Sequence, residues 1–547
     1  MKRITLAAAL LLTACSAEAQ NSAYGPPSEV QDLYEVAIAP SADRIQADIQ
    51  TLVDFGTRHT LSETESDTRG IGAARRWIFE EFEKISAECG GCLEVIYVSD
   101  TIEGERRIPE PTEVVSVLAI QRGTTDPNRY VMMSGDIDSR VTDPLNGTYD
   151  SPGANDNASG MAGTIEAARI LSKRKYAGSI IYAGLSGEEQ GLFGGKIVAD
   201  YALAEGWEIK GVLNNDMISN ITGIDGVTNN STVRVFSEGT RANETEAEAR
   251  SRRFTGGEVD SPSRNLARYV KAQGDQYLTN LDIMMVYRLD RFGRGGHHRP
   301  FNVVGIPGIR IMETHEHYDR QHQDLRIEGA MILSLKDKDQ ISPIYDADYL
   351  FNDTANTVRL AVDQIYAGLQ SSHYSVTVIS DTALEIRTTS ETSVKELRLN
   401  NILFDFGHRK IDLNKLFNIR DARRFYGDTM DGVDSVYAAK LTALNAITLA
   451  GMAGAPPFPA NVEATGAVRP SAKLTWETPE NADNLAGYRV HWRLTTEPEW
   501  THSRFIGKVN EWTFENLVID NYFFGVSAVA EDGSETPVVF PGAAGRF

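Results

Sequence analysis

Cysteine is scarce in this chain, with 3 residues among 547. This number excludes a small scaffold held together by many disulfides, because such scaffolds need a dense set of cysteines. The two internal cysteines, Cys89 and Cys92, form a CGGC sequence directly before the apolar stretch LEVIYV. A redox CxxC usually opens a helix, and no second CxxC or nearby histidine completes a zinc site. The pair therefore predicts a local disulfide that closes a turn.

An excess of positive charge is also absent. The chain has 54 Lys and Arg residues against 76 Asp and Glu residues, which gives a formal net charge of −22. Nucleic-acid-binding proteins need a basic face, and anionic membrane surfaces attract basic segments. The sequence therefore predicts no nucleic-acid partner and no binding to the membrane surface through charge.

Long apolar runs are confined to the N-terminus, because no other stretch reaches the ~18 apolar residues of a membrane span. Residues 1–20 carry two basic residues, an apolar run and small residues, which is typical of an export signal. The sequence LTAC ending at Cys15 resembles a bacterial lipobox, in which Cys15 is lipidated; the alternative is cleavage after Ala19. We expect a periplasmic or outer-membrane lipoprotein, or alternatively a secreted protein, with membrane contact only through the lipid.

The chemistry centres on residues 131–160, VMMSGDIDSRVTDPLNGTYDSPGANDNASG. A short apolar run ends here in two carboxylates at alternate positions, Asp136 and Asp138, and a loop with Asp156 then opens a helical pattern. In an α/β sheet, ligands bind at the carboxyl ends of strands. A helix cap would explain Asp156 alone, so the stretch favours a binding site.

Two later stretches repeat this design. SIIYAGLSGEEQG ends an apolar run in Glu188 and Glu189, and GVLNNDM ends another in Asp216. His322, in YDRQHQD, offers a nitrogen ligand. Acidic residues at three strand ends are what a site for one or two divalent cations requires.

Taken together, these motifs resemble those of the co-catalytic zinc aminopeptidases, peptidase family M28. That family's pattern runs H-x-D-S, P-G-x-x-D-N-A-S-G, E-E-x-G-L-x-G, N-x-D-M and a late histidine. The resemblance covers about residues 41–324 and a closing helix near 432–450. It implies a zinc-exopeptidase fold, peptide substrates and two zinc ions per chain.

The resemblance also implies roles for individual residues. The expected metal ligands are Asp136, Asp156, Glu189, Asp216 and His322. Asp156 would bridge the two ions. Glu188 would be the general base that takes a proton from the attacking water, and Asp138 would support catalysis by orienting a ligand through a hydrogen bond.

Two positions depart from the family pattern. Asp136 replaces the first histidine, and the family's Gly-Gly-Asp-His-x-x-Phe is GGHHRPF at 295–301. Asp136 adds a hard oxygen donor, which favours Mn or Mg more than usual. We expect Asp136 to remain a ligand with His297 as its electrostatic counterweight, and His297 and His298 to contact substrate or orient ligands. The alternative is drift in a site that has lost a metal, although buried unpaired carboxylates are costly.

Alternating strand and helix patterns from 93 to 312 predict an α/β fold with a doubly wound, mostly parallel sheet flanked by helices. The expected peptidase domain spans 28–328, is interrupted by an insert at 329–424 and closes at 425–453. A linker at 454–460 leads to 461–547, which resembles a fibronectin type III sandwich. That module is expected to contact the cell surface or another protein.

Three functions are consistent with these residues. The first is a metal-dependent exopeptidase that cleaves the N-terminal peptide bond. The second is aminoacyl transfer like that of glutaminyl cyclases, which share the fold and use one zinc, held here by Asp156, Glu189 and His322. The third is a surface binding protein on a peptidase shell that has lost catalysis. The number of bound metal ions distinguishes the three.

Overall fold

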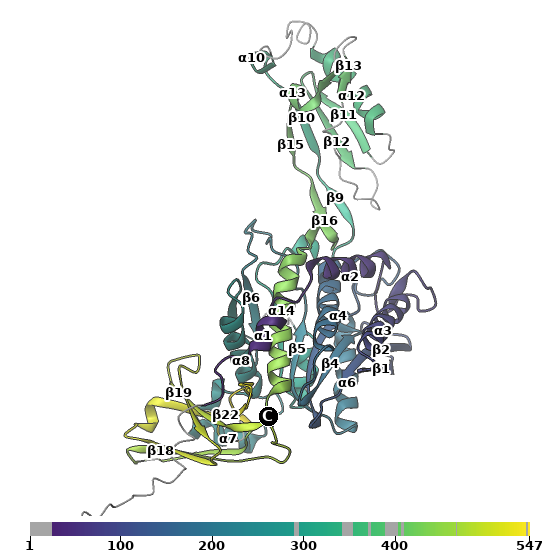
Figure 1. The fold of residues 1–547 in the computed structure, drawn as a ribbon. Coiled ribbons are helices and arrows are strands. Elements are labelled where there is room, and N and C mark those ends of the chain that lie inside the picture. Colours follow the sequence, from purple (N-terminus) through teal and green to yellow (C-terminus); the bar gives the residue numbers. More distant parts are fainter. Residues whose placement is uncertain are drawn as a thin grey trace, which may run out of the picture.

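The computed structural model describes residues 25–288, 295–341, 354–369, 374–388, 403–405, 410–466, 468–542 and 545–547. The predicted export signal and Cys15 lie outside these residues. Figure 1 shows a central α/β body, a lobe above it and a β-sandwich below it. The disulfide expected at the CGGC turn is present between Cys89 and Cys92.

The body is built on an eight-stranded sheet with the order β1-β2-β4-β3-β5-β8-β6-β7. Its central pairs, β4–β3, β3–β5 and β5–β8, are parallel, whereas β1, β2 and β6 join their inner neighbours antiparallel. The fold class is the one the sequence predicts, with antiparallel pairs toward both edges. The strands are β1 (Leu93–Ile102), β2 (Thr112–Gln121), β3 (Asp126–Asp136), β4 (Gly178–Leu185), β5 (Glu208–Asn215), β6 (Thr232–Phe236), β7 (Asp282–Val286) and β8 (Gly308–Glu313).

Successive side chains of a strand point to opposite faces of the sheet, and helices bury both faces. On β3, Val131 and Met133 belong to one core, whereas Tyr130 and Met132 belong to the core on the opposite face. One face is covered by α1 (Gln31–Ala37), α2 (Ala42–Asp54), α3 (Gly70–Glu88), α4 (Gly160–Leu171), α8 (Pro262–Tyr277) and α14 (Ser435–Gly454). The other face is covered by α6 (Phe193–Ala204) and α9 (His298–Val303).

Helix α14 is long and apolar enough to cross a membrane by length and composition. The sequence prediction that no such stretch follows the N-terminus is therefore wrong by this measure. However, 83% of its most apolar window is buried inside the protein, and Figure 1 shows it running along the middle of the body. Its apolar character is explained by burial in the core.

The lobe is joined to the body by a two-stranded ribbon, β9 (Arg326–Glu328) with β16 (Arg424–Tyr426) (Figure 1). Its sheet has the order β11-β12-β10-β15 and a hydrophobic core of its own. The elements are β10 (Met331–Leu335), α10 (Lys338–Ile341), α12 (Thr354–Leu369), β11 (Tyr374–Ser380), β12 (Ala383–Thr388), β13 (Leu403–Asp405), β14 (Lys410–Asp412), α13 (Leu413–Leu416) and β15 (Phe417–Asp421).

The C-terminal region is an all-β sandwich of two three-stranded sheets, β17-β18-β21 and β20-β19-β22. Its buried residues share one continuous core with the body. The expected linker is not exposed: Ala455 and Phe458 are buried, and Arg129 donates hydrogen bonds to the carbonyls of Met452 and Ala455. The strands are β17 (Ala460–Thr465), β18 (Ser471–Glu477), β19 (Leu485–Leu494), β20 (His502–Gly507), β21 (Glu511–Glu515) and β22 (Tyr522–Ala530).

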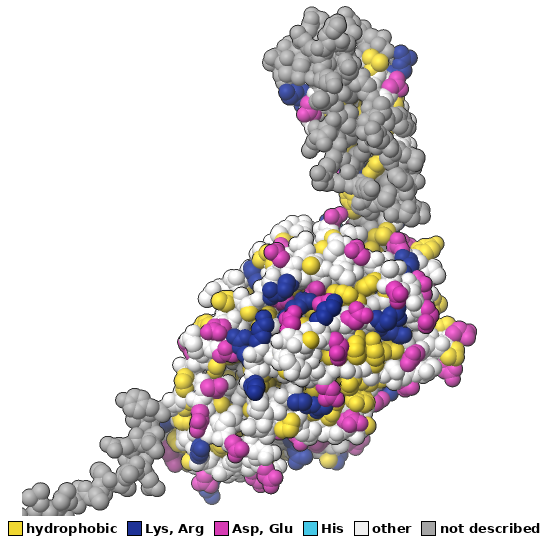
Figure 2. All heavy atoms as spheres, turned by 45° about the vertical axis from the view of Figure 1, so that its right-hand side comes forward, with side chains coloured by type: hydrophobic (Ala, Val, Ile, Leu, Met, Phe, Trp, Pro, Cys, Tyr) yellow, Lys and Arg dark blue, Asp and Glu magenta, His cyan; other side chains and the backbone are white. Residues whose placement is uncertain are grey.

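A buried ion cluster fixes the sandwich to the body. Asp260 lies 2.8 Å from Arg493 of β19 and 2.7 Å from Arg268 of α8, and all three side chains are almost fully buried. On the face drawn in Figure 2, basic and acidic side chains are interspersed. The negative net charge is therefore not gathered into one patch on that face.

Candidate metal centre

The site lies at the carboxyl ends of the central parallel strands. Asp136 is the last residue of β3, Glu188 and Glu189 begin the short helix α5 (Glu188–Gly191) after β4, and Asp216 directly follows β5. Three neighbouring strands thus deliver carboxylates to one edge of the sheet, where α/β folds bind their ligands.

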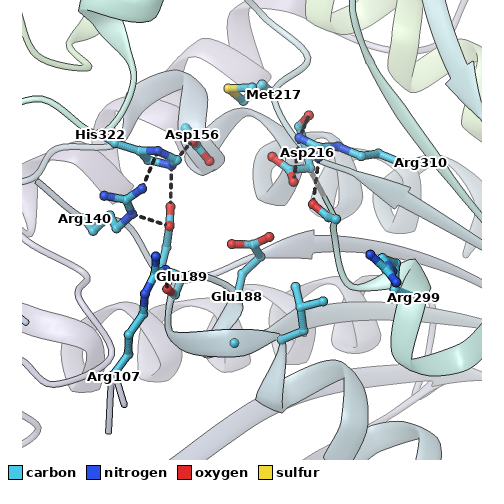
Figure 3. A pocket seen from close by; sticks show the side chains of 13 residues that line it. Arg107, Arg140, Asp156, Glu188, Glu189, Asp216, Met217, Arg299, Arg310 and His322 are labelled. Carbon is cyan, nitrogen blue, oxygen red and sulfur yellow. Dashed lines mark hydrogen bonds and ion pairs between the residues drawn. The ribbon is translucent and has the colours of Figure 1, made fainter. Parts of the chain in front are cut away.

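Three of the five predicted ligands converge on one point. The Nε2 atom of His322 lies 2.7 Å from Asp156 Oδ2 and 2.8 Å from Glu189 Oε1. Among the described residues, these three form a group whose ligand atoms all lie within 4.8 Å of one another. We call Asp156, Glu189 and His322 the Asp156 triad (Figure 3).

Arg140 supports the Asp156 triad from its outer side. Its Nε lies 2.6 Å from Glu189 Oε2, and its Nη2 lies 2.8 Å from His322 Nδ1. Burial alone would raise the pKa of Glu189, but His322 and Arg140 lower it to about 2. Burial would likewise lower the pKa of His322, but Glu189 and Asp156 raise it to about 10. The centre of the triad therefore attracts positive charge strongly.

Asp156 is held by a residue that the sequence motifs did not indicate. Asp156 lies in the turn Ala154–Ser159, where its own backbone is not helical, with φ of −109° and ψ of 90°. The carboxylate of Asp428 accepts hydrogen bonds from the backbone N–H groups of Asn155 at 2.8 Å and Asp156 at 2.6 Å. Asp428 follows the ribbon by two residues, so the segment that returns from the lobe positions the triad.

Asp138 acts on the backbone of the Glu188-Glu189 turn. Its two carboxylate oxygens accept hydrogen bonds from the N–H groups of Glu188 at 3.1 Å and Glu189 at 3.0 Å. Burial, followed by the Glu189 charge, raises the pKa of Asp138 to about 7. Asp138 thus orients the expected base and one expected ligand together, and it contacts neither side chain through these bonds.

Asp136 and His297 are in direct contact. His297 Nδ1 lies 2.5 Å from Asp136 Oδ1, and Asn157 Nδ2 donates to Asp136 Oδ2 at 2.7 Å. Burial raises the pKa of Asp136 to about 8 and lowers the pKa of His297 to about 4. Burial therefore favours the neutral forms of both groups and works against the protonated His297 that a counterweight would need.

Asp216 is paired with a cation that sequence analysis missed. Arg310, in the middle of β8, places Nη2 2.8 Å from Asp216 Oδ2, and both side chains are buried. We call Asp216 and Arg310 the Asp216 pair. The sequence does contain a signal for this pair, which is the charged Arg310 within the otherwise apolar run GIRIM. A buried arginine is almost always paired, so this residue indicates a buried acidic partner.

A pocket connects the Asp156 triad, the Asp216 pair and Glu188. Its cavity of about 440 Å³ is also lined by Arg107, Arg140, Gly191, Leu192, Met217, Gly295 and Arg299. Figure 3 shows Glu188 between the triad and the pair. Leu192, Met217 and His322 have φ of 66°, 64° and 52°, which is strained for residues other than glycine and is common at functional sites.

The two adjacent histidines are not among the residues that line this cavity. His297 and His298 are both buried, so direct substrate contact, one of the two expected roles, does not fit their placement. His297 contacts the site through its hydrogen bond with Asp136. The Nδ1 atom of His298 is buried and has no hydrogen-bond partner among the described residues.

The Asp156 triad fits a zinc ion chemically. One imidazole and two carboxylates are common zinc ligands, and three protein ligands with one open position are typical of catalytic zinc. The arginine on the outer side orients these ligands in the way that outer contacts do at metal sites. The first-ion position, formed by Asp136 and Asp216, does not fit equally well, because His297 and Arg310 contact its carboxylates and no third ligand atom converges with them among the described residues. In the triad, Arg140 contacts the Glu189 oxygen that His322 does not contact.

Comparison with known proteins gives one family match. The model of peptidase family M28 matches residues 116–328. A probable zinc metalloprotease from Leptosphaeria maculans is 34% identical over 517 residues, which cover 94% of this chain and 97% of that protein. A probable zinc metalloprotease from Pyricularia oryzae is 33% identical over 538 residues, with 95% and 88% covered.

Solved structures of similar proteins include two enzymes. The aminopeptidase LapA of Legionella pneumophila is 20% identical, with 54% of this chain and 65% of that chain covered and a TM-score of 0.39. The glutaminyl cyclase of Porphyromonas gingivalis is 17% identical, with 51% and 85% covered and a TM-score of 0.36.

Proposed function

Since this chain belongs to the zinc metalloproteases of peptidase family M28, we propose that it is an exopeptidase that hydrolyses the N-terminal peptide bond of peptides. The single observation that carries this proposal is the meeting of the Asp156 triad and Glu188 in one pocket. A cavity of about 440 Å³ suits the end of a peptide chain, because typical small-ligand pockets have volumes of about 300–1,000 Å³.

The residues of this chain have distinct tasks in the proposed reaction. Zinc held by the Asp156 triad would supply Lewis-acid chemistry and lower the pKa of water. Burial, together with the charges of Glu189, Asp216 and other carboxylates, raises the pKa of Glu188 well above its usual range. A carboxylate with a raised pKa is a stronger base. Glu188 would take a proton from the attacking water and later return it to the leaving amine.

Positioning supports this role for Glu188. Its backbone N–H is fixed by Asp138, and the neighbouring Glu189 is fixed by Asp138 and Arg140. The base and a ligand therefore sit on one rigid turn. Such rigidity matters because small misplacements of reacting groups cost large factors in rate.

The test is a set of peptides with mapped products. Aminoacyl-nitroanilides and short free peptides should lose single residues from the N-terminus in the presence of zinc, whereas N-acetylated forms of the same peptides should resist. Release of C-terminal residues, or cleavage of the acetylated peptides, would contradict the proposed cleavage at the free N-terminus.

Glutaminyl-cyclase chemistry is a second candidate, favoured by one observation. Three ligands converge in the Asp156 triad, and three protein ligands suffice for a single catalytic zinc. Peptides that begin with glutamine distinguish the two functions, because a cyclase would release ammonia and leave every peptide bond intact. A peptidase would release the first residue instead.

Export as a lipoprotein is proposed from the LTAC sequence at Cys15 alone. The wild-type protein should partition into detergent, and Cys15→Ser should release it. A wild-type protein free in the periplasm, beginning near Gln20, would contradict lipidation.

A further inference from the structure

At the position expected for a first metal ion, protein donors contact both carboxylates that would be its ligands. Arg310 Nη2 lies 2.8 Å from Asp216 Oδ2. Asp216 and Arg310 are only 4% and 5% exposed, so this is a buried ion pair. A guanidinium has five donors and no lone pair, and therefore it compensates the carboxylate but cannot bind a metal.

Asp136 has both carboxylate oxygens engaged as well. One oxygen is 2.5 Å from His297 Nδ1, and the other accepts from Asn157 Nδ2 at 2.7 Å. In the Asp156 triad, by contrast, Arg140 contacts the outer oxygen Oε2 of Glu189. This leaves Oε1 of Glu189 directed at His322 Nε2, which lies 2.8 Å away.

Arg310 is held rigidly where it stands. In the β5–β8 pairing it is opposite Asn214, two residues before Asp216. Its Nη1 donates to the carbonyl of Gly295 at 2.8 Å. The backbone at Gly295 and Gly296 lies close to Asp216: a Cβ added to Gly296 would be 3.3 Å from Asp216 Oδ2. A second dication beside Arg310 would meet a fixed charge of the same sign at short range.

We propose that this chain binds one zinc ion, at the Asp156 triad, and that the guanidinium of Arg310 takes the place of the second ion by compensating Asp216. The inference rests on the proposed function only in requiring that the triad binds zinc. It is independent of which bond the enzyme cleaves.

The experiment counts zinc in the purified full-length protein after zinc loading and removal of excess metal, by elemental analysis and by calorimetric titration. The matched variants are Asp156→Asn and Asp216→Asn, which make the same change at two buried carboxylates. The wild type should bind about one equivalent, Asp156→Asn close to none, and Asp216→Asn still about one, because three protein ligands form a complete catalytic zinc site.

Asp216→Asn leaves Arg310 buried without its partner and could therefore unfold the chain. The double variant Asp216→Asn with Arg310→Met removes both charges and should fold and bind about one equivalent. Two equivalents of zinc on the wild type would overturn the inference, and loss of one of them in Asp216→Asn or in the double variant would identify Asp216 as a ligand. One equivalent on the wild type with no peptidase activity would overturn the proposed function and leave this inference intact.

Discussion

The Asp156 triad and the Asp216 pair contain similar side chains, but we expect only the triad to bind zinc. Both use buried carboxylates near the carboxyl ends of the central parallel strands, and an arginine contacts a carboxylate in each. In the triad, Arg140 lies outside and leaves three ligand atoms facing one another. In the pair, Arg310 lies on Asp216 Oδ2, and among the described residues Asp216 does not belong to a group of converging ligand atoms. A carboxylate near a strand end therefore fits a metal ion where one of its oxygens faces other ligand atoms, even if an arginine holds its second oxygen.

Motif matching alone does not determine the number of bound metal ions. Asp216 matches the family's N-x-D-M motif as well as Asp156 matches its own motif. The motifs identify the carboxylates but not the partner of each carboxylate, because that partner comes from a different strand.

The largest expected effect is on turnover, and it distinguishes the role of Glu188 from that of Glu189. Glu188→Gln should lower turnover by about two to four orders of magnitude, the usual contribution of a general base, while zinc binding stays close to that of the wild type. Glu189→Gln, the matched change at the next residue, should remove zinc. The measurements are turnover and zinc content. Zinc loss in Glu188→Gln with normal zinc in Glu189→Gln would mean that the two roles are reversed.

The next effect is on stability, and it tests whether Arg310 is needed to compensate the charge of Asp216. Arg310→Met leaves Asp216 buried and uncompensated, which should cost about 3–5 kcal/mol of unfolding free energy. Arg140→Met should cost less in the zinc-loaded protein, because zinc still compensates Glu189. Urea unfolding of both variants measures this. An equal or larger loss in Arg140→Met would contradict the difference between the two arginines.

A smaller effect is expected from the residue that fixes Asp156. Asp428→Asn keeps the shape but replaces one of the two oxygens that accept from backbone N–H groups with an NH2 donor. Loss of such an outer contact typically lowers metal affinity about 10–100-fold. Competition with a zinc chelator measures this affinity, and Asp431→Asn, a change on the same segment, is the control. Unchanged affinity in Asp428→Asn would show that the turn holds its shape alone.

The smallest effect is the pH dependence of the metal-free protein. Burial raises the pKa of Asp428 and Asp138 to about 7 and of Asp136 to about 8. These three groups make the folded state bind more protons than the unfolded state between about pH 4 and pH 8, whereas the lowered pKa of His297 opposes them between about pH 4 and pH 6.5. Stability should therefore fall as pH rises, most clearly above about pH 6.5. Each excess proton contributes up to about 1.4 kcal/mol per pH unit. The lowered pKa of Glu189 acts below about pH 4.5 and leaves this window unchanged.

Urea unfolding of the chelator-treated and zinc-loaded proteins across this pH range checks the sign. The metal-free protein should show the steeper loss, because zinc near these carboxylates lowers their pKa. A metal-free protein that gains stability toward pH 8 would contradict the burial of protonated carboxylates.

The α/β body and the residues of the Asp156 triad could be predicted, because the patterns that indicate them lie within short stretches of sequence. The alternation of apolar runs and helical patterns indicates the α/β body, and the triad residues lie in short motifs. Arg310 is 94 residues from Asp216, and Asp428 is 272 residues from Asp156. No local pattern joins residues so far apart. The sandwich was expected beyond a linker, but the buried pair of Arg493 and Asp260 ties it to the body.

The most direct test of a single zinc site is a crystal structure of the zinc-loaded protein with anomalous scattering at the zinc edge. We expect one strong peak per chain, bound by Asp156, Glu189 and His322, with Arg310 still paired to Asp216. A second peak of similar height between Asp136 and Asp216, with Arg310 displaced, would contradict it.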